Sequence, residues 1–165
     1  MSAADVFESD FDAAAYRLRA ATPGTDEFRR ALKEVLAEVY AFREHRKNQR
    51  TDYYDLADRR SKGRASEGLV AVRNVAVHHL ATLITVTGPK QHNPSRLVGP
   101  AGPIVASQPA LTWLSVSEMT VQPANLVGPA KPNVYYQDAL AGREVFGVIE
   151  SARGFLVSPG YLGPL

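Results

Sequence analysis

The sequence lacks several features that would assign it to a particular class of protein. It has no cysteine, which excludes a disulfide scaffold, a thiolate zinc site and a cysteine nucleophile. No run of 18 residues is free of polar side chains, so no membrane-spanning helix is expected. The N-terminal segment is acidic, whereas a secretory signal begins with basic residues. We therefore expect a cytoplasmic protein with no membrane partner.

The composition indicates one ordinary folded unit. The chain has 165 residues, of which 45% are hydrophobic, and this is enough for one sizeable core. We therefore expect a single domain over residues 1–165. The net charge is only +2, but the cations are unevenly distributed. Between Arg43 and Arg64, eight Lys and Arg residues stand against four acidic ones, a local excess of +4.

Hydrophobic periodicity predicts a mainly α fold, a bundle of four or five helices with a small β-hairpin insertion. The clearest amphipathic pattern begins at Thr25, and Asp26 and Glu27 favour the positive end of that helix. Ser66 is the expected N-cap of a later, longer helix, and Gly88 and Pro89 should end it. The expected helices span residues 5–20, 25–42, 52–58, 66–86 and 133–156, with a loop at 61–64 and Asn133 as the last N-cap.

A segment rich in proline and glycine separates the last two expected helices. Residues 88–132 hold eight of the eleven prolines, so no long helix is expected there. Within it, Leu111–Val121 is rich in β-forming residues and predicts a strand, paired with Ile104–Ser107 in a hairpin. Because the segment is also apolar, we expect an ordered flap packed beside the bundle.

The expected helix 66–86 carries three polar residues in an otherwise apolar run. Arg73, Asn74 and His78 are residue types that are costly to bury without a partner or a role. Asn74 and His78 are one turn apart and can hydrogen-bond, whereas Arg73 and His78 differ in direction by about 140°. That divergence is best accommodated if the helix is covered on one side by its own bundle and on the other by the same helix of a second protomer.

An Arg followed directly by Asn, with His five residues after the Arg, resembles the signature of HEPN domains. These are small helical proteins that include many ribonucleases of toxin and phage-defence systems. The resemblance implies a homodimer with a composite active site and no metal or cofactor, which cleaves an RNA substrate to 2′,3′-cyclic phosphate ends. It also implies an antitoxin or defence partner protein. One branch of the family is silenced by nucleotide transfer to a Tyr two residues after the His; Leu80 stands at that position here, so this form of control is not expected.

The resemblance also assigns roles to the three polar residues. His78 would act as the acid and base, because imidazole titrates near neutrality. Arg73 would bind the phosphate, because its guanidinium is always charged and donates two parallel hydrogen bonds. Asn74 would orient the imidazole or contact the substrate.

The basic stretch that follows residue 42 is a candidate RNA-binding surface. Cations and amides can hold a phosphate backbone, and Tyr53 and Tyr54 offer surfaces on which bases could stack. The interspersed acidic residues leave a second interpretation open, that of a solvated helix end. The expected RNA-binding residues are Arg43, Arg46, Lys47 and Arg50.

Two alternatives to the ribonuclease interpretation belong to other functional classes. One is a catalytically silent HEPN-like module that binds RNA or a nucleotide through the basic stretch. The other is a helical interaction protein in which Arg73 forms a buried, structural salt bridge. The candidate partners of Arg73 in that case are Asp10, Asp12, Glu34 and Glu38.

Overall fold

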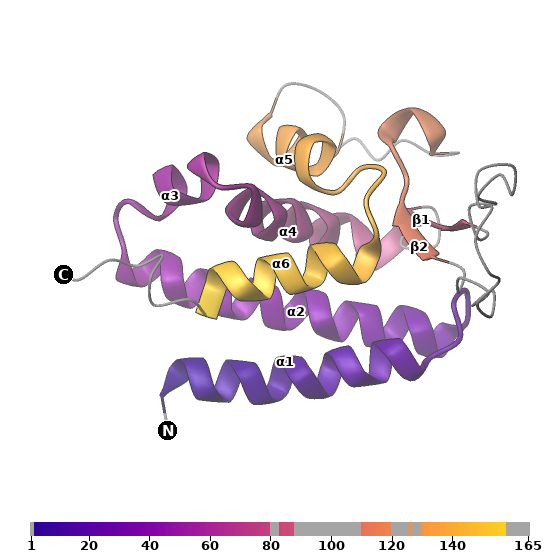
Figure 1. Cartoon of the computed structure of the whole chain (residues 1–165), viewed down its shortest axis with the longest axis horizontal. Coiled ribbons are helices and arrows are strands. Elements are labelled where there is room, and N and C mark those ends of the chain that lie inside the picture. The colour runs from indigo at the N-terminus through magenta and orange to yellow at the C-terminus, as the bar shows by residue number, and fades with distance from the viewer. Residues whose placement is uncertain (1, 80–82, 88–109, 120–125, 127–129, 158–165) are drawn as a thin grey trace, which may run out of the picture.

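The computed structural model describes residues 2–79, 83–87, 110–119, 126 and 130–157, and it shows a helical bundle with a small sheet at one end (Figure 1). Its helices are α1 (Ala3–Ala20), α2 (Asp26–Gln49), α3 (Tyr53–Arg59), α4 (Ser61–His79), α5 (Lys131–Ala139) and α6 (Val145–Val157). Its strands are β1 (Ile84–Thr87) and β2 (Ala110–Trp113). The predicted fold class is therefore confirmed. No described helix is long and apolar enough to cross a membrane.

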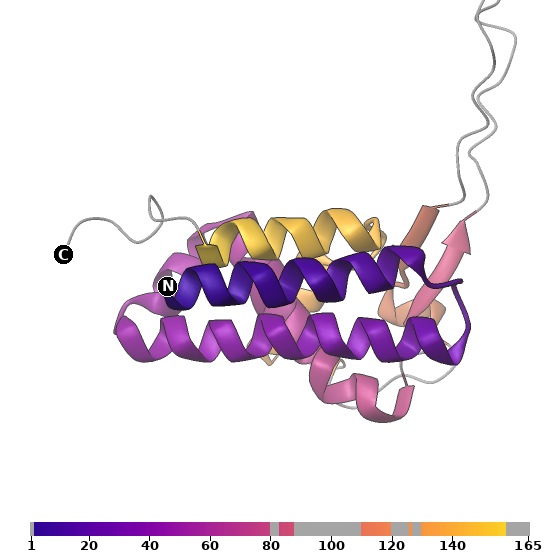
Figure 2. The same cartoon turned by 90° about the horizontal axis from the view of Figure 1, so that it is seen from below.

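Helices α1 and α2 form an antiparallel pair along one side of the bundle (Figure 2). Helix α1 begins with a capping box in which Ser2 and Asp5 exchange hydrogen bonds of 2.6 and 3.1 Å. Thr25 caps α2, as the sequence predicts, by accepting a hydrogen bond from the Phe28 amide. The pair is joined by apolar side chains, including Phe7, whose ring stacks on that of Phe42 at 4.1 Å.

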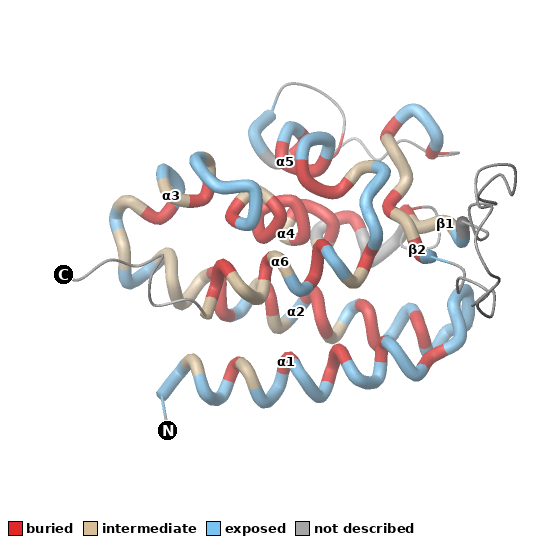
Figure 3. Tube along the Cα trace, in the orientation of Figure 1, coloured by how far each residue is buried: buried red, intermediate tan, exposed pale blue. Residues whose placement is uncertain are grey.

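Helix α4 lies at the centre of the bundle, in contact with α2, α3, α5 and α6. It begins at Ser61, so the expected loop at 61–64 is wrong, and Ser66 is a buried residue inside the helix rather than its N-cap. Two glycines let neighbouring helices approach: a Cβ at Gly63 would lie 2.5 Å from the Ala57 backbone, and one at Gly68 would lie 2.5 Å from the Leu140 side chain. The side chains packed around α4 form one continuous core (Figure 3).

The small sheet replaces the end of the helix predicted over residues 66–86. Strand β1 begins at Ile84, because the run Ile-Thr-Val-Thr is β-branched throughout and favours extended backbone over helix. It pairs antiparallel with β2, with Ile84 opposite Trp113 and Thr87 opposite Ala110. The strand predicted at Leu111–Val121 is therefore real but ends at Trp113, and a 3₁₀ helix follows at Val116–Glu118. The predicted partner, Ile104–Ser107, lies outside the described residues.

The helix predicted over 133–156 is two helices, α5 and α6, separated by a turn at residues 140–144. Gly142 has a φ of +71°, which a residue with a side chain rarely adopts. The turn is held against β2, because the Gly142 amide donates to the Trp113 carbonyl at 2.8 Å and the Trp113 amide donates to the Arg143 carbonyl at 3.0 Å. Ala130 occupies the N-cap position of α5 without a side-chain hydrogen bond, and the predicted cap, Asn133, is a buried residue inside the helix.

A buried ion pair joins α2 to α4. The Arg43 guanidinium donates from Nε and Nη2 to the two oxygens of Glu67, at 3.0 and 2.7 Å. The same carboxylate accepts the Tyr53 hydroxyl of α3 at 2.9 Å, and Arg43 also donates to Glu44 and to the Tyr54 hydroxyl. Burial works against the charge on Arg43, but its hydrogen bonds and attraction to Glu67 outweigh burial and raise the pKa of Arg43.

We predict that breaking this pair destabilises the protein far more than breaking an exposed one. Glu67→Ala leaves the Arg43 charge buried without its main partner and should lower the free energy of unfolding by about 3–5 kcal/mol. The matched control is Glu34→Ala, because the Arg17–Glu34 pair has side chains that are 55% and 40% exposed, against 9% and 5% for Arg43 and Glu67. That change should cost about 1 kcal/mol or less. Urea unfolding measures the free energy of unfolding of both variants. An equal decrease in the two would contradict the prediction.

The carboxylates of Asp10, Glu34 and Glu38 lie near one another on α1 and α2, and the pKa of Glu38 is raised. Burial, together with the negative charges of Asp10 and Glu34, raises the pKa of Glu38 above its ordinary value of 4.5. Ionisation of Glu38 therefore costs more in the folded protein than in the unfolded chain. Protonated Glu38 therefore makes the folded state more stable than ionised Glu38 does. This contribution is fully present below about pH 4.5 and is lost as the pH rises through the folded-state pKa of Glu38.

Glu38→Gln should accordingly stabilise the protein at neutral pH and have little effect in acid. The amide keeps the shape of the side chain and removes the ionisation that Asp10 and Glu34 oppose. Thermal unfolding of the variant and the wild type should give midpoints that converge below pH 4 and separate, in favour of the variant, as the pH rises. A lower midpoint for the variant at pH 7 would show that the sign is wrong.

Candidate functional site

Arg73, the first residue of the motif, lies on α4 where that helix passes α2. Its side chain is half-buried, and its guanidinium carbon sits 4.0 Å from the centre of the Tyr40 ring. This cation–π contact positions the guanidinium without neutralising it. Arg73 is thus held by an aromatic face, and no carboxylate of the described residues forms an ion pair with it.

The structural salt bridge proposed for Arg73 is not found among the described residues. Two of the four candidate carboxylates have other partners: Glu34 pairs with Arg17 at 2.8 Å, and Asp12 pairs with Arg153 at 3.1 Å. Glu38 faces other acids instead. Among the described residues, a buried salt bridge is formed instead by Arg43, whose partner, Glu67, lies inside α4.

Asn74 and His78 belong to the same helix, four residues apart, and so stand about one turn from each other along α4. Their side chains lie outside the described part of the structure. The hydrogen bond between them, and the polar stripe they would form, remain predictions. What the backbone provides is a rise of about 7.5 Å between Arg73 and His78 along the helix axis.

The two ends of α4 have different surroundings. The first part of the helix is enclosed, with Ala65, Leu69 and Val72 buried in the common core. The last turns of α4, pink in Figure 2, project past α2 on the side of α2 that faces away from α1. A second protomer could therefore reach α4 along the segment 73–79 rather than along the whole helix.

The four expected RNA-binding residues differ in their surroundings. Arg43 points into the core, so it is not available to a phosphate backbone, and this corrects its assignment. The Arg46 guanidinium lies 4.8 Å from the centre of the Phe42 ring, and its Nε donates to the Leu156 carbonyl at 2.8 Å; burial lowers its pKa. Lys47 and Arg50 are partly exposed and pair with the acidic residues Glu44 and Asp52.

The end of α2 is therefore not simply the solvated helix end that the sequence left open as an interpretation. It packs against the end of α6, and Arg46 takes part in that packing through its hydrogen bond to the Leu156 carbonyl. The two tyrosines also differ in exposure: Tyr53 is buried, whereas Tyr54 is 40% exposed. Only Tyr54 could offer a stacking surface to a base.

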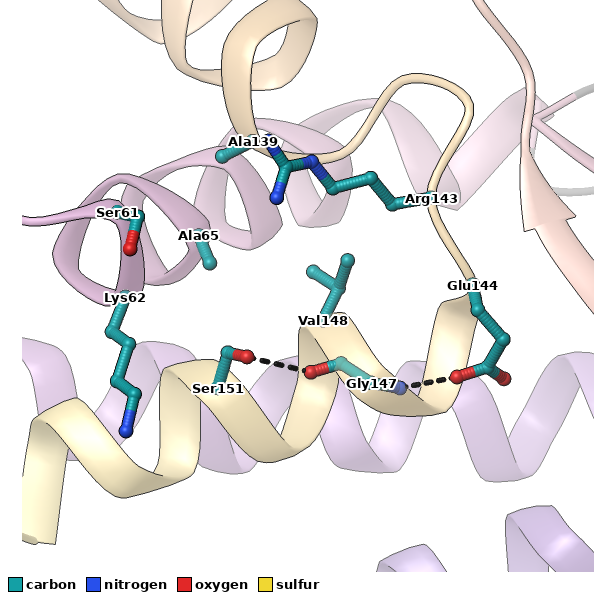
Figure 4. Close-up of a pocket in the computed structure, with 9 residues that line it drawn as sticks. All are labelled: Ser61, Lys62, Ala65, Ala139, Arg143, Glu144, Gly147, Val148 and Ser151. Atoms are coloured by element: carbon teal, nitrogen blue, oxygen red, sulfur yellow. Dashed lines mark hydrogen bonds between the residues drawn. The ribbon is translucent and has the colours of Figure 1, made fainter.

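A second feature, which sequence reasoning missed, is a cavity of about 240 Å³ between α4, α6 and the turn before α6 (Figure 4). Two cations, Lys62 and Arg143, stand at its edge, and its walls are small residues. The sequence carries no clear signal for it, because Arg143 lies in the turn before α6, and only Gly147 and Ser151, four residues apart, share one face of that helix. Among the described residues, no group of three His, Asp or Glu side chains is placed to hold a metal.

No protein-family model matches the chain, no curated protein matches it, and no solved structure matches it. The resemblance to HEPN domains therefore stands on the Arg73-Asn74-His78 motif and on its place in a helix of a helical bundle.

Proposed function

We propose that the protein is a metal-independent endoribonuclease whose composite active site forms between two copies of the chain. The observation that carries this proposal is the state of Arg73. It is half-buried and positioned by Tyr40, it has no carboxylate partner in the described part of the chain, and it stands five residues before His78 on one helix. A structural arginine of that degree of burial is normally paired, whereas a phosphate ligand must keep its donors available.

The chemistry follows from the two residue types. One His78 removes the proton of the ribose 2′-hydroxyl, and the 2′-oxygen attacks the adjacent phosphorus. The bond from phosphorus to the 5′-oxygen breaks, and the His78 of the second copy protonates that leaving oxygen. The products are a 2′,3′-cyclic phosphate and a 5′-hydroxyl. Arg73 stabilises the charge that develops on the phosphate oxygens, and Asn74 holds the imidazole in the required orientation.

Helix α2 supplies a route for the RNA backbone beside this site. Lys47 lies seven residues after Tyr40, so the two share a face of α2 and are about 10 Å apart along it. A strand whose scissile phosphate is bound at Arg73 could therefore continue over Lys47 toward Arg50. Phosphate would compete with Glu44 and Asp52 for these cations, whose exposed pairs contribute little. An endoribonuclease of this kind belongs to toxin or phage-defence systems, where an antitoxin or defence partner would restrain it.

The first test is mutagenesis with RNA cleavage as the readout. His78→Ala and Arg73→Ala should each reduce cleavage of single-stranded RNA by about 10²-fold or more, because each removes a group that acts in the transition state. Cleavage should persist in EDTA, since the proton transfers and charge stabilisation come from side chains, and it should leave cyclic-phosphate ends. His45→Ala and Arg30→Ala are the matched controls and should cleave normally.

The controls are chosen for their surroundings. His45 stacks on Phe42 and contacts Gln49, and Arg30 is an exposed residue of α2 without an ion pair to any described residue. Circular dichroism should show unchanged helix content in all four variants. If the wild type binds a set of RNAs and cuts none of them, the binding-module alternative replaces the enzyme; if the His78→Ala variant cuts as well as the wild type, the assigned site is wrong.

The second test concerns assembly. A composite site needs two copies of the segment 73–79 to face each other, so the protein should sediment as a dimer at micromolar concentration. Val77→Arg, which places a charge on these projecting turns, should yield a monomer and lower cleavage at the same time. A wild-type monomer that cleaves RNA would contradict the shared site while leaving the cleavage chemistry open to a single copy.

A further inference from the structure

The cavity between α4, α6 and the α5–α6 turn is separate from the motif and is built differently. Its walls are small side chains from three elements: Ala65 of α4, Ala139 of α5, and Gly147, Val148 and Ser151 of α6. The space exists because each of these positions holds a residue too small to fill it. Its volume of about 240 Å³ equals that of about eight water molecules at the ~30 Å³ that each occupies in the liquid. This is room for a phosphate group with a short organic body.

The charge at the rim is positive, because two cations, Lys62 and Arg143, stand against one carboxylate, that of Glu144. Lys62 and Arg143 are both exposed, and neither is ion-paired within the part of the chain that the structure describes. Figure 4 shows the Arg143 guanidinium over the cavity and Lys62 along its opposite rim. The flexible stem of Lys62 allows its ammonium to swing over the opening. Arg143 donates one hydrogen bond, from Nη2 to the Asp138 carbonyl at 3.1 Å, which steadies the guanidinium.

The one acidic residue at the cavity, Glu144, is occupied by the backbone. Its two carboxylate oxygens accept the amides of Phe146 and Gly147, at 2.9 and 2.5 Å. It therefore caps the start of α6, and Figure 4 shows one of its carboxylate oxygens turned toward the Gly147 amide. An anion that enters the cavity meets Arg143 and Lys62 first.

The backbone of Arg143 is anchored before any ligand binds. Its carbonyl accepts the Trp113 amide, its own amide donates to the Leu140 carbonyl, and the next residue bridges to Thr112 of β2. Trp113 is fully buried, so this turn is anchored to the core. A cation held in place loses little freedom on binding an anion, which favours affinity.

We propose that this cavity binds a small phosphomonoester, with the phosphate between Arg143 and Lys62 and the organic body against Ala65, Ala139 and Val148. The Ser151 hydroxyl donates to the Gly147 carbonyl at 2.8 Å, so its oxygen remains an acceptor for a hydroxyl group of the body. A free phosphate would satisfy the cations and leave the apolar walls uncovered. The site uses none of the residues assigned to RNA cleavage.

The experiment is titration of the ¹⁵N-labelled protein with glycerol 3-phosphate, followed by two-dimensional NMR. The amides of residues 61–65 and 143–151 should shift and saturate at millimolar concentration. Inorganic phosphate and sulfate should both bind more weakly, because neither covers the apolar walls, and glycerol should produce no saturable shift. Arg143→Gln and Lys62→Gln should each weaken binding about tenfold or more, because each removes hydrogen bonds to a charged group.

The matched controls are Arg30→Gln and Lys33→Gln, which remove the same charges from exposed positions on α2 and should leave the affinity unchanged. Absence of saturable shifts with glycerol 3-phosphate would overturn the site. So would equal binding by Arg143→Gln and the wild type, or binding of sulfate as tight as that of glycerol 3-phosphate. Because RNA cleavage uses other residues, the Arg143→Gln variant should still cleave, and a failure of one proposal leaves the other standing.

Discussion

The buried pair of Arg43 and Glu67 is the interaction on which the rest of the bundle depends. A guanidinium and a carboxylate that lose water together are stable only when every donor and acceptor around them is satisfied. Tyr53 from α3 donates to the pair, and its ring packs edge-on to Phe155 of α6. The requirement to satisfy one buried carboxylate thus sets the positions of four helices relative to one another.

The same pair determines how the motif meets its aromatic support. Helix α2 carries Tyr40 one turn before Arg43, and α4 carries Arg73 six residues after Glu67. Once Arg43 and Glu67 are joined by two hydrogen bonds, α4 cannot slide along α2 without breaking them. The stacking of Arg73 on Tyr40 is a consequence of that register. A core interaction therefore orients a residue that the sequence marks out for chemistry.

Those parts of the fold that local signals encode could be predicted from the sequence. The start of α2 and the existence of a central helix through residues 66–79 follow from apolar spacing, whereas the cap predicted for that helix, Ser66, was wrong. The role of Glu67 could not, because an acid near an expected helix start is locally favourable and nothing nearby shows a partner 24 residues earlier in the chain. Strand β1 was also missed, since Leu80, Leu83 and Ile84 continue the apolar spacing of the preceding helix, although the alternating β-branched run from Ile84 is itself a strand signal.

The motif and the cavity also differ in what the sequence indicates. It singles out the motif residues as a candidate site, because three polar side chains in an expected apolar helix depart from the pattern, and such departures concentrate at functional positions. The cavity was not, because it depends on β2 holding the α5–α6 turn, a contact between residues about thirty apart. A continuous helix from 133 to 156 would carry Arg143 on the helix surface with no cavity beside it. The left-handed Gly142 and the Trp113 backbone break that helix, so the sheet, the smallest part of the fold, creates the space that the cations border.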